Sequence, residues 1–294
     1  MQARAPLLER LLARADPPDD SGDWRAHAFN LIAPDEARLP AVASVALTSS
    51  ASPIAGSWVC MATPVHLLAG MSSVGMAADG VLEIEPAEAD ALAADFNRVF
   101  GGDGVRLERG RDALLLCGFE APLRVTMTDP AEVMGRDIWA HLPRGEDASR
   151  LHRLTSEIEL WLFDHAVNRL RHEAARPAIS SLWLWGGGAA DSETPVVRGW
   201  TAGDDPLFAS FARQSRYPGA SYSGVVTVSD WPGTPAWRDF EELWLAPAVD
   251  DLKSGRLHGI ELSARRRCVH LHARALRRFW RRARPWWETL ADAD

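Results

Sequence analysis

The stretch that most constrains the fold is an alternating tryptophan segment followed by three glycines. Residues 181–185 read Ser-Leu-Trp-Leu-Trp, and Gly186, Gly187 and Gly188 follow directly. Alternating large apolar side chains suit an extended strand, because successive residues face opposite sides of a sheet. Glycines at its end let the backbone turn tightly or approach a ligand closely. The segment therefore predicts a strand that ends beside a turn or a ligand.

The residues before this strand predict one long helix over residues 147–174. Apolar side chains recur there at intervals of three and four, which places them on one face of a helix. The members of this face are Leu151, Leu154, Ile158, Trp161, Leu162 and His165.

Shorter elements are predicted along the rest of the chain. Strands are expected over residues 42–47, 57–60, 66–68, 105–108, 113–119, 225–228, 256–262 and 267–273. Helices are expected over residues 3–15, 85–100, 236–246 and 274–283, with Pro247 stopping or kinking the third. Because strands alternate with helices, the pattern predicts an α/β fold with a mixed sheet and flanking helices.

A polar, proline-containing segment separates the first helix from the rest of the chain. Residues 17–20 read Pro-Pro-Asp-Asp, which is typical of a linker. We therefore expect an N-terminal helix and linker over residues 1–20. A single α/β domain over residues 21–294 would follow, ending in a basic hairpin and helix.

The composition is that of a globular chain without a disulfide framework. A chain of 294 residues with 47% hydrophobic content can bury a sizeable core. Cys60, Cys117 and Cys268 are odd in number and lack paired metal-binding spacing, so a reducing cytoplasm is expected. No apolar signal-peptide core occurs in residues 1–20. Residues 39–78 contain no Asp, Glu, Lys or Arg, a feature that membrane-spanning segments share. Because prolines interrupt this segment and no long apolar run occurs in it, we expect buried strands instead of a membrane helix.

Positive charge is concentrated toward the end of the chain. Residues 253–285 carry Lys253 and ten arginines against Glu261 alone, a net +10, so that the rest carries −18. Such a segment is either a solvated face that pairs with acidic neighbours or a surface for a partner. The predicted partner surface comprises Arg277, Arg278, Trp280, Arg281 and Arg282. Arginines among aromatic residues suit single-stranded nucleic acid, but the overall charge of −8 disfavours that partner.

Polar residues near the end of the predicted long helix are candidates for ligand binding. Asn168 and Arg171 lie three residues apart and share a helix face, so they could hold a phosphate or a carboxylate. They could equally bond to the loop that follows and pair with Asp164. His165 could join them or be a satisfied core histidine. The predicted ligand-binding set is His165, Asn168, Arg171, Trp183, Trp185, Gly186, Gly187 and Gly188.

Six segments, in order, carry a resemblance to a known family. They are residues 60–67 (CMATPVHL), 85–89 (EPAEA), 127–137 (MTDPAEVMGRD), 142–145 (LPRG), 165–188 and 278–282 (RFWRR). Together they resemble the bacterial RpfE-type family of regulatory proteins, over roughly residues 40–285.

That family is similar to part of the archaeal-type cofactor-independent phosphoglycerate mutases, which implies an alkaline-phosphatase-like fold. The shared pattern is H-P-V-N-x-x-R, a proline-rich turn and N-S/A-x-W-x-W-G-x-G. This chain keeps His165, Val167, Asn168, Arg171, Pro177, Trp183, Trp185, Gly186 and Gly188. It departs at Ala166 and Ala178, where the pattern has Pro, at Ala175 for Gly and at Ser180 for Asn.

The resemblance implies a mutase that holds two divalent ions, Mn²⁺ or Mg²⁺, by Asp and His side chains beside a Ser or Thr nucleophile. Such ions would neutralise developing phosphoryl charge. The sequence departs from this requirement. Asp230 follows a predicted strand but has no His four residues later, and Asp137 and His141 have that spacing outside a strand.

The sequence therefore predicts a non-catalytic regulatory or metabolite-binding protein that lacks a catalytic metal site and a cofactor. Its expected ligand is a small phosphorylated or carboxylated metabolite, with a protein partner also expected at the basic terminus and no membrane or nucleic acid. One alternative is a working phosphoglycerate mutase. The other is an interaction scaffold or nucleic-acid-binding protein that uses the arginine- and tryptophan-rich terminus.

Overall fold

The structure is a computed structural model that describes residues 4–20, 22–36, 38–48, 56–71, 73–211, 213–228, 237–264 and 267–290. The chain forms two compact units. Unit 1 is built from Met1–Leu39, Pro195–Ser229 and Thr234–Asp294. The described residues of unit 2 belong to the continuous segment Pro40–Thr194. This division differs from the single domain predicted over residues 21–294. The α/β fold with flanking helices is confirmed.

Unit 2 contains a five-stranded antiparallel sheet. Its strands are β2 (Trp58–Ala69), β3 (Val74–Val81), β4 (Val105–Arg109), β5 (Leu115–Phe119) and β8 (Ser181–Ala189). The order is β3-β2-β5-β4, and β8 also pairs with β2. The two short strands predicted at 57–60 and 66–68 are parts of the single strand β2. A separate hairpin joins β6 (Val125–Thr126) to β7 (Arg144–Gly145).

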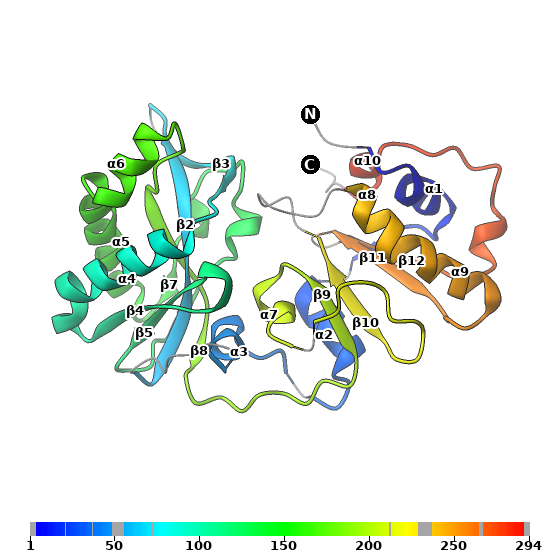
Figure 1. Cartoon of the computed structure of the whole chain (residues 1–294), viewed down its shortest axis with the longest axis horizontal. Coiled ribbons are helices and arrows are strands. Elements are labelled where there is room, and N and C mark those ends of the chain that lie inside the picture. Colours follow the sequence, from blue (N-terminus) through cyan, green and yellow to red (C-terminus); the bar gives the residue numbers. More distant parts are fainter. Residues whose placement is uncertain are drawn as a thin grey trace. The chain divides into compact units, whose positions relative to one another are not determined.

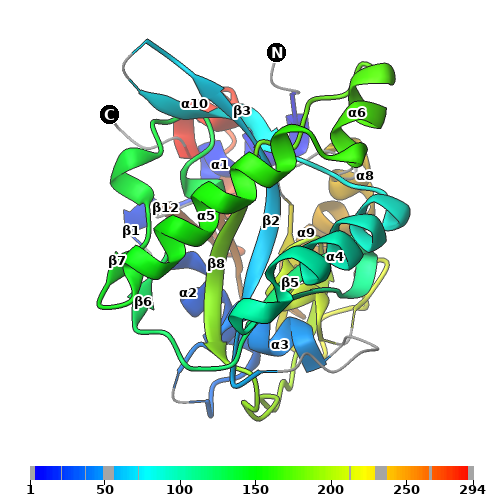
Figure 2. The ribbon, with the colours of Figure 1, turned by 90° about the vertical axis from the view of Figure 1, so that its left-hand side faces the viewer.

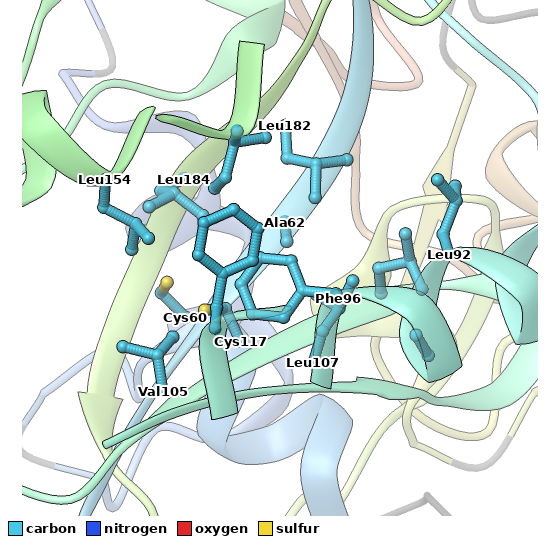
Figure 3. Close-up of a cluster of buried hydrophobic side chains, with 14 of the residues drawn as sticks. Cys60, Ala62, Leu92, Phe96, Val105, Leu107, Cys117, Leu154, Leu182 and Leu184 are labelled. Atoms are coloured by element: carbon cyan, nitrogen blue, oxygen red, sulfur yellow. The ribbon is translucent and has the colours of Figure 1, made fainter. Parts of the chain in front are cut away.

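Two long helices cover one face of this sheet. They are α4 (Pro86–Phe100), which contacts β4, and α5 (Ala148–Phe163), which contacts β8 and crosses it in Figure 2. Side chains from both helices and from the strands meet in one apolar core (Figure 3). Cys60 and Cys117, which face each other across β2 and β5, lie in this core as free thiols. Burial raises the pKa of the Cys60 thiol well above its usual value, so it packs as an apolar group.

The helix predicted over residues 147–174 is two helices. α5 ends at Phe163 and α6 (Ala166–Glu173) begins after Asp164 and His165. His165 has extended backbone and is the N-cap of α6: its Nδ1 accepts the amide of Val167 at 3.2 Å. The start of α6 explains why the predicted long helix is interrupted, because an N-cap residue such as His165 has a non-helical backbone conformation.

Residues 42–47 form a helix and not the predicted strand. α3 (Val42–Thr48) packs against β2 and β8 at the glycine end of β8. The glycines themselves lie inside β8 and not in a loop after it. A Cβ at Gly188 would clash with Ala41, and one at Gly187 with the Trp58 ring. The glycines thus let neighbouring side chains pack directly on the strand.

Unit 1 joins the first and last segments of the chain. β1 (Asp19–Asp20) pairs with β12 (Arg267–Leu271), which pairs with β11 (Ile260–Ala264) in the order β1-β12-β11 (Figure 1). α1 (Pro6–Arg14) and α9 (Ala246–Ser254) share an apolar core with this sheet. The segment predicted as an N-terminal helix and linker is therefore part of a unit that the C-terminal segment completes.

A second sheet of unit 1 contains two parallel strands, β9 (Trp200–Gly203) and β10 (Gly224–Thr227). The helices near them are α2 (Trp24–Ile32) and α7 (Pro206–Ala209). α8 (Trp237–Phe240) continues through a π-helical turn, Glu241–Leu245, into α9. Pro247 therefore does not stop the helix. It closely follows the wider π-helical turn, an irregularity in the hydrogen-bond ladder that a proline would otherwise interrupt.

The predicted basic helix over residues 274–283 does not form. Only a 3₁₀ turn, Ala275–Arg277, occurs there, and a short helix α10 (Trp286–Leu290) follows. Arg278 donates to the carbonyls of Arg14 and Ala15 at 3.0 and 3.2 Å, and Arg281 donates to Ala15 at 2.9 Å. These bonds satisfy the carboxyl end of α1, where cations are favoured. No helix in the described ranges is long and apolar enough to cross a membrane.

Candidate functional site

Asn168 fixes the loop between α6 and β8. Its Nδ2 donates to the carbonyls of Leu162 and Ile179 at 2.8 and 2.9 Å, and its Oδ1 accepts the amide of Ile179 at 2.8 Å. The side chain is buried. A buried amide with these three bonds has most of its hydrogen-bonding capacity satisfied within the protein.

Arg171 is buried and joins α6 to α4. Its Nε donates to the carbonyl of Pro177 at 2.7 Å, and its Nη1 lies 2.9 Å from Glu88 Oε1. Glu88 also accepts the amide of Glu85 at 2.8 Å, in a capping box at the start of α4. The guanidinium and carboxylate form a nearly dry ion pair, with side-chain exposures of 3% and 15%.

His165 lies between α6 and the aromatic core. Its ring packs edge-on against Trp161, with centroids 4.6 Å apart. Nε2 is 3.2 Å from Asp95 Oδ2, although the two are not aligned as a hydrogen bond. Burial lowers the pKa of His165, and the nearby Asp95 carboxylate only partly opposes this effect. The ring is therefore a neutral cap in the folded protein near pH 7.

The two tryptophans of β8 are anchored by their indole nitrogens. Trp183 Nε1 donates to the carbonyl of Thr128 at 2.8 Å, and Trp185 Nε1 donates to Thr63 Oγ1 at 2.7 Å. Both rings are buried. Together with the close packing at Gly187, these bonds hold β8 against β2 and the chain around Thr128.

The predicted ligand-binding residues are thus all in unit 2. Asn168, Arg171, Trp183 and Trp185 bond within the protein, whereas Nε2 of His165 makes no hydrogen bond with the described part of the chain. The structure brings His165, Asn168 and Arg171 together around α6. The bond to the following loop, which the sequence left open for Asn168 and Arg171, is confirmed. The alternative pairing of Arg171 with Asp164 is wrong, because Arg171 pairs with Glu88 and Asp164 pairs with Arg169. Binding of a ligand by these residues stays a prediction. Glu88, the ionic partner of Arg171, was missed; its position in the capping pattern E-P-A-E was the available signal.

A cavity of about 450 Å³ lies in unit 1 at the carboxyl ends of β9 and β10. Gly203 and Thr227 end the two strands at its wall. Polar side chains on its lining are Arg213, Gln214, Ser215 and Asp239, and the apolar part comes from Phe240, Leu243 and Trp244. In open α/β sheets, ligands bind outside the carboxyl ends of parallel strands. Sequence reasoning missed this cavity, because its polar residues are divided between the loop after α7 and the distant helix α8.

The other predicted groups are not among the residues that line this cavity. Asp137 Oδ1 accepts the amide of Trp139 at 2.8 Å, as a turn residue does. Asp230 lies outside the described residues. On the predicted partner surface, Arg277, Trp280 and Arg282 are exposed, while Arg278 and Arg281 bond to the end of α1.

The donors needed for two Mn²⁺ or Mg²⁺ ions are not grouped in the part of the chain that the structure describes. There, three or more potential ligands meet in the set His27, Glu261 and Cys268. This set contains one carboxylate and a thiol, whereas Mn²⁺ and Mg²⁺ prefer oxygen ligands. The described residues therefore do not fit the metal pair that the mutase resemblance implies.

No protein family model matches the chain. A probable 2,3-bisphosphoglycerate-independent phosphoglycerate mutase of Geobacter sulfurreducens is 34% identical over 104 residues, which are 35% of this chain and 22% of that protein. The 2,3-bisphosphoglycerate-independent phosphoglycerate mutase of Methanothrix thermoacetophila is 40% identical over 65 residues, which are 22% and 17% of the two chains. Part of this chain is homologous to these mutases. It spans about a fifth of their length.

A solved cofactor-independent phosphoglycerate mutase from Thermoplasma acidophilum aligns with 76% of this chain and 69% of its own, at 14% identity and a TM-score of 0.38. So loose a superposition does not establish a shared fold. The relation to the mutases thus depends on the sequence matches. The finer resemblance to the RpfE-type family stays a prediction.

Proposed function

We propose that this chain is a non-catalytic regulatory or metabolite-binding relative of the phosphoglycerate mutases. Its ligand would be a small phosphorylated or carboxylated metabolite. The observation that carries the proposal is the cavity at the carboxyl ends of β9 and β10, which is lined by a guanidinium, an amide and a hydroxyl. Its size is ordinary for a site that takes a small molecule.

The contacts of the mutase-like motif support the non-catalytic part of the proposal. Asn168 and Arg171 hold the loop before β8 and the start of α4, so their retention has a structural explanation. The chain can keep this motif without keeping a phosphoryl-transfer site. We therefore place the ligand in the cavity of unit 1 and not at α6.

The chemistry of the cavity favours an anion that also has hydroxyl groups. Arg213 can meet a phosphate or carboxylate through two parallel N–H bonds. Gln214 and Ser215 offer further donors on the same exposed loop. Asp239 on the cavity lining can accept a hydrogen bond from a hydroxyl group of the ligand. A hydroxy acid with a single phosphate matches this pattern.

Calorimetric titration with 3-phosphoglycerate, with and without Mn²⁺, tests the proposal. We expect saturable binding that needs no metal and that falls at least tenfold in Arg213→Ala. Arg216→Ala is the matched control, because Arg216 is exposed on the same loop but does not line the cavity. The proposed site is contradicted if the wild type shows no heat of binding. It is also contradicted if Arg213→Ala binds 3-phosphoglycerate as tightly as the wild type.

A further inference from the structure

A second group of reactive side chains lies in unit 1, on the hairpin of β11 and β12. Cys268 and His270 are two residues apart on β12, and Glu261 and Ser263 are two apart on β11, so each pair shares one face of its strand. The register places Glu261 opposite His270 and Ser263 opposite Cys268. All four side chains therefore lie on the same face of the sheet.

The opposite face of the hairpin is occupied by the apolar core of unit 1. Val269 and Leu271 alternate with Cys268 and His270, and both are buried in the core with α1 and α9. Packing thus fixes the register of β12 and with it the face that carries the thiol and the imidazole.

His27 on α2 completes the group from a distant part of the chain. Its Nε2 lies 2.6 Å from Glu261 Oε2. One ligand atom from each of His27, Glu261 and Cys268 lies within 4.8 Å of the other two. The second oxygen of Glu261, Oε1, is 3.3 Å from Nδ1 of His270. A thiol, two imidazoles and a carboxylate thus converge from three elements.

These separations are close to those around a single metal ion. Nitrogen and oxygen ligands lie about 2.0–2.2 Å from Zn²⁺ and thiolates about 2.3 Å, so two ligand atoms of one tetrahedral ion are about 3.3–3.6 Å apart. The set within 4.8 Å needs only small side-chain rotations to reach this range. The bond between His27 and Glu261 must lengthen, which is easy because both side chains are about one-third exposed, at 34% and 29%.

We propose that His27, Glu261 and Cys268 bind one divalent transition-metal ion, with Zn²⁺ as the best match, and that His270 orients the Glu261 carboxylate. A mixed S, N and O donor set suits Zn²⁺ and excludes Mg²⁺ and Ca²⁺, which require oxygen ligands. A carboxylate that binds a metal is usually held in its orientation by a hydrogen bond from a second side chain. With three protein ligands, the ion would keep one position open to solvent.

The electrostatics of the group also favour a cation. The negative charges of Glu261 and Asp19 act on the Cys268 thiol. A divalent ion among these groups would offset both carboxylates and stabilise the thiolate.

The alternative is a simple ion pair between His27 and Glu261 beside an inert buried thiol. The two explanations differ in whether the sulfur takes part. Cobalt(II) distinguishes them, because only a thiolate ligand gives an intense sulfur-to-metal charge-transfer absorption. Binding through Cys268 also releases its proton.

The test is a titration of the metal-stripped full chain with Co²⁺, followed by Zn²⁺ competition. We expect one equivalent of Co²⁺ to produce the charge-transfer band and Zn²⁺ to remove it. Cys268→Ser should abolish the band, while Cys60→Ala should retain it, since Cys60 is buried in unit 2. Circular dichroism checks that each variant is folded.

Two further variants keep the test decisive if Cys268→Ser misfolds. His27→Gln alters a partly exposed side chain and should weaken Zn²⁺ at least tenfold in equilibrium dialysis. His270→Ala should weaken it about 10–100-fold, the usual effect of removing an orienting partner. Absence of the band in the wild type, its survival in Cys268→Ser, or unchanged Zn²⁺ affinity in His27→Gln overturns the proposal.

Discussion

At the scale of single residues, the mutase-like motif works as a set of structural bonds. Arg171 shows this most directly, because its guanidinium neutralises Glu88 at the packed junction of α6 and α4. Arg176 also approaches Glu88, at 3.3 Å, but from a more exposed position. Loss of Arg171 would leave a poorly solvated carboxylate with only this weaker partner.

We therefore predict that Arg171→Ala lowers the free energy of unfolding by about 3 kcal/mol, the cost of breaking a buried pair on one side. Arg169→Ala is the control, since Arg169 pairs with Asp164 at the surface, and surface pairs contribute about 0–1 kcal/mol. Urea unfolding measures both variants. Equal small losses would show that the buried pair has no special structural role.

His165 makes stability depend on pH. Its pKa is lowered in the folded state by burial, so the unfolded chain takes up a proton at a higher pH than the native one. Stability therefore falls as the pH decreases from about 6.5, the ordinary histidine value, toward the lowered folded value. His165→Asn keeps an N-cap acceptor and should reduce this acid sensitivity in urea midpoints measured between pH 7 and 5. An identical pH profile would contradict the assignment.

At the scale of elements, local pattern predicted most strands, and tertiary packing decided the exceptions. The β4–β5 and β11–β12 hairpins and the helix after Glu85 followed from alternation, turn residues and a proline at the helix start. Residues 42–47 are predicted as a strand but become α3, which docks closely on the glycines of β8. No local signal encodes that contact.

Two helix errors have physical causes that the sequence partly contained. The α5–α6 break lacks its usual marker, because Ala166, the first residue of α6, stands where the related pattern has Pro. The predicted terminal helix would have set Arg274, Arg277, Arg278 and Arg281 at repelling three- and four-residue spacings. Arg278 and Arg281 instead satisfy the end of α1, a distant contact that periodicity cannot reveal.

The glycines of β8 allow a direct test of this packing. Gly187→Ala would place a methyl group against the Trp58 ring and should cost about 1–3 kcal/mol by overpacking. Gly102→Ala is the matched control, because nothing lies within 4 Å of a Cβ there and its φ is not in the left-handed region. Thermal unfolding should separate the two variants by several degrees. Equal unfolding midpoints would show that the Trp58 ring moves aside without loss of stability.

At the scale of the whole molecule, the two units differ in how the chain builds them. Unit 2 is a continuous segment with its own core, whereas unit 1 needs both α1 and β12. We predict that a fragment of residues 40–194 folds alone, with dispersed amide signals in NMR spectra. A fragment of residues 195–294 should not, because it lacks α1 and β1. A folded C-terminal fragment, or an unfolded 40–194 fragment, would contradict the division.

The central claim is that a chain related to the phosphoglycerate mutases binds a metabolite without converting it. The most direct measurement is formation of 2-phosphoglycerate from 3-phosphoglycerate by the purified full chain at saturating substrate, with and without added Mn²⁺. We predict no product above the protein-free background in either condition. Product that requires Mn²⁺ and increases in proportion to the protein would contradict the account and establish the chain as a working mutase.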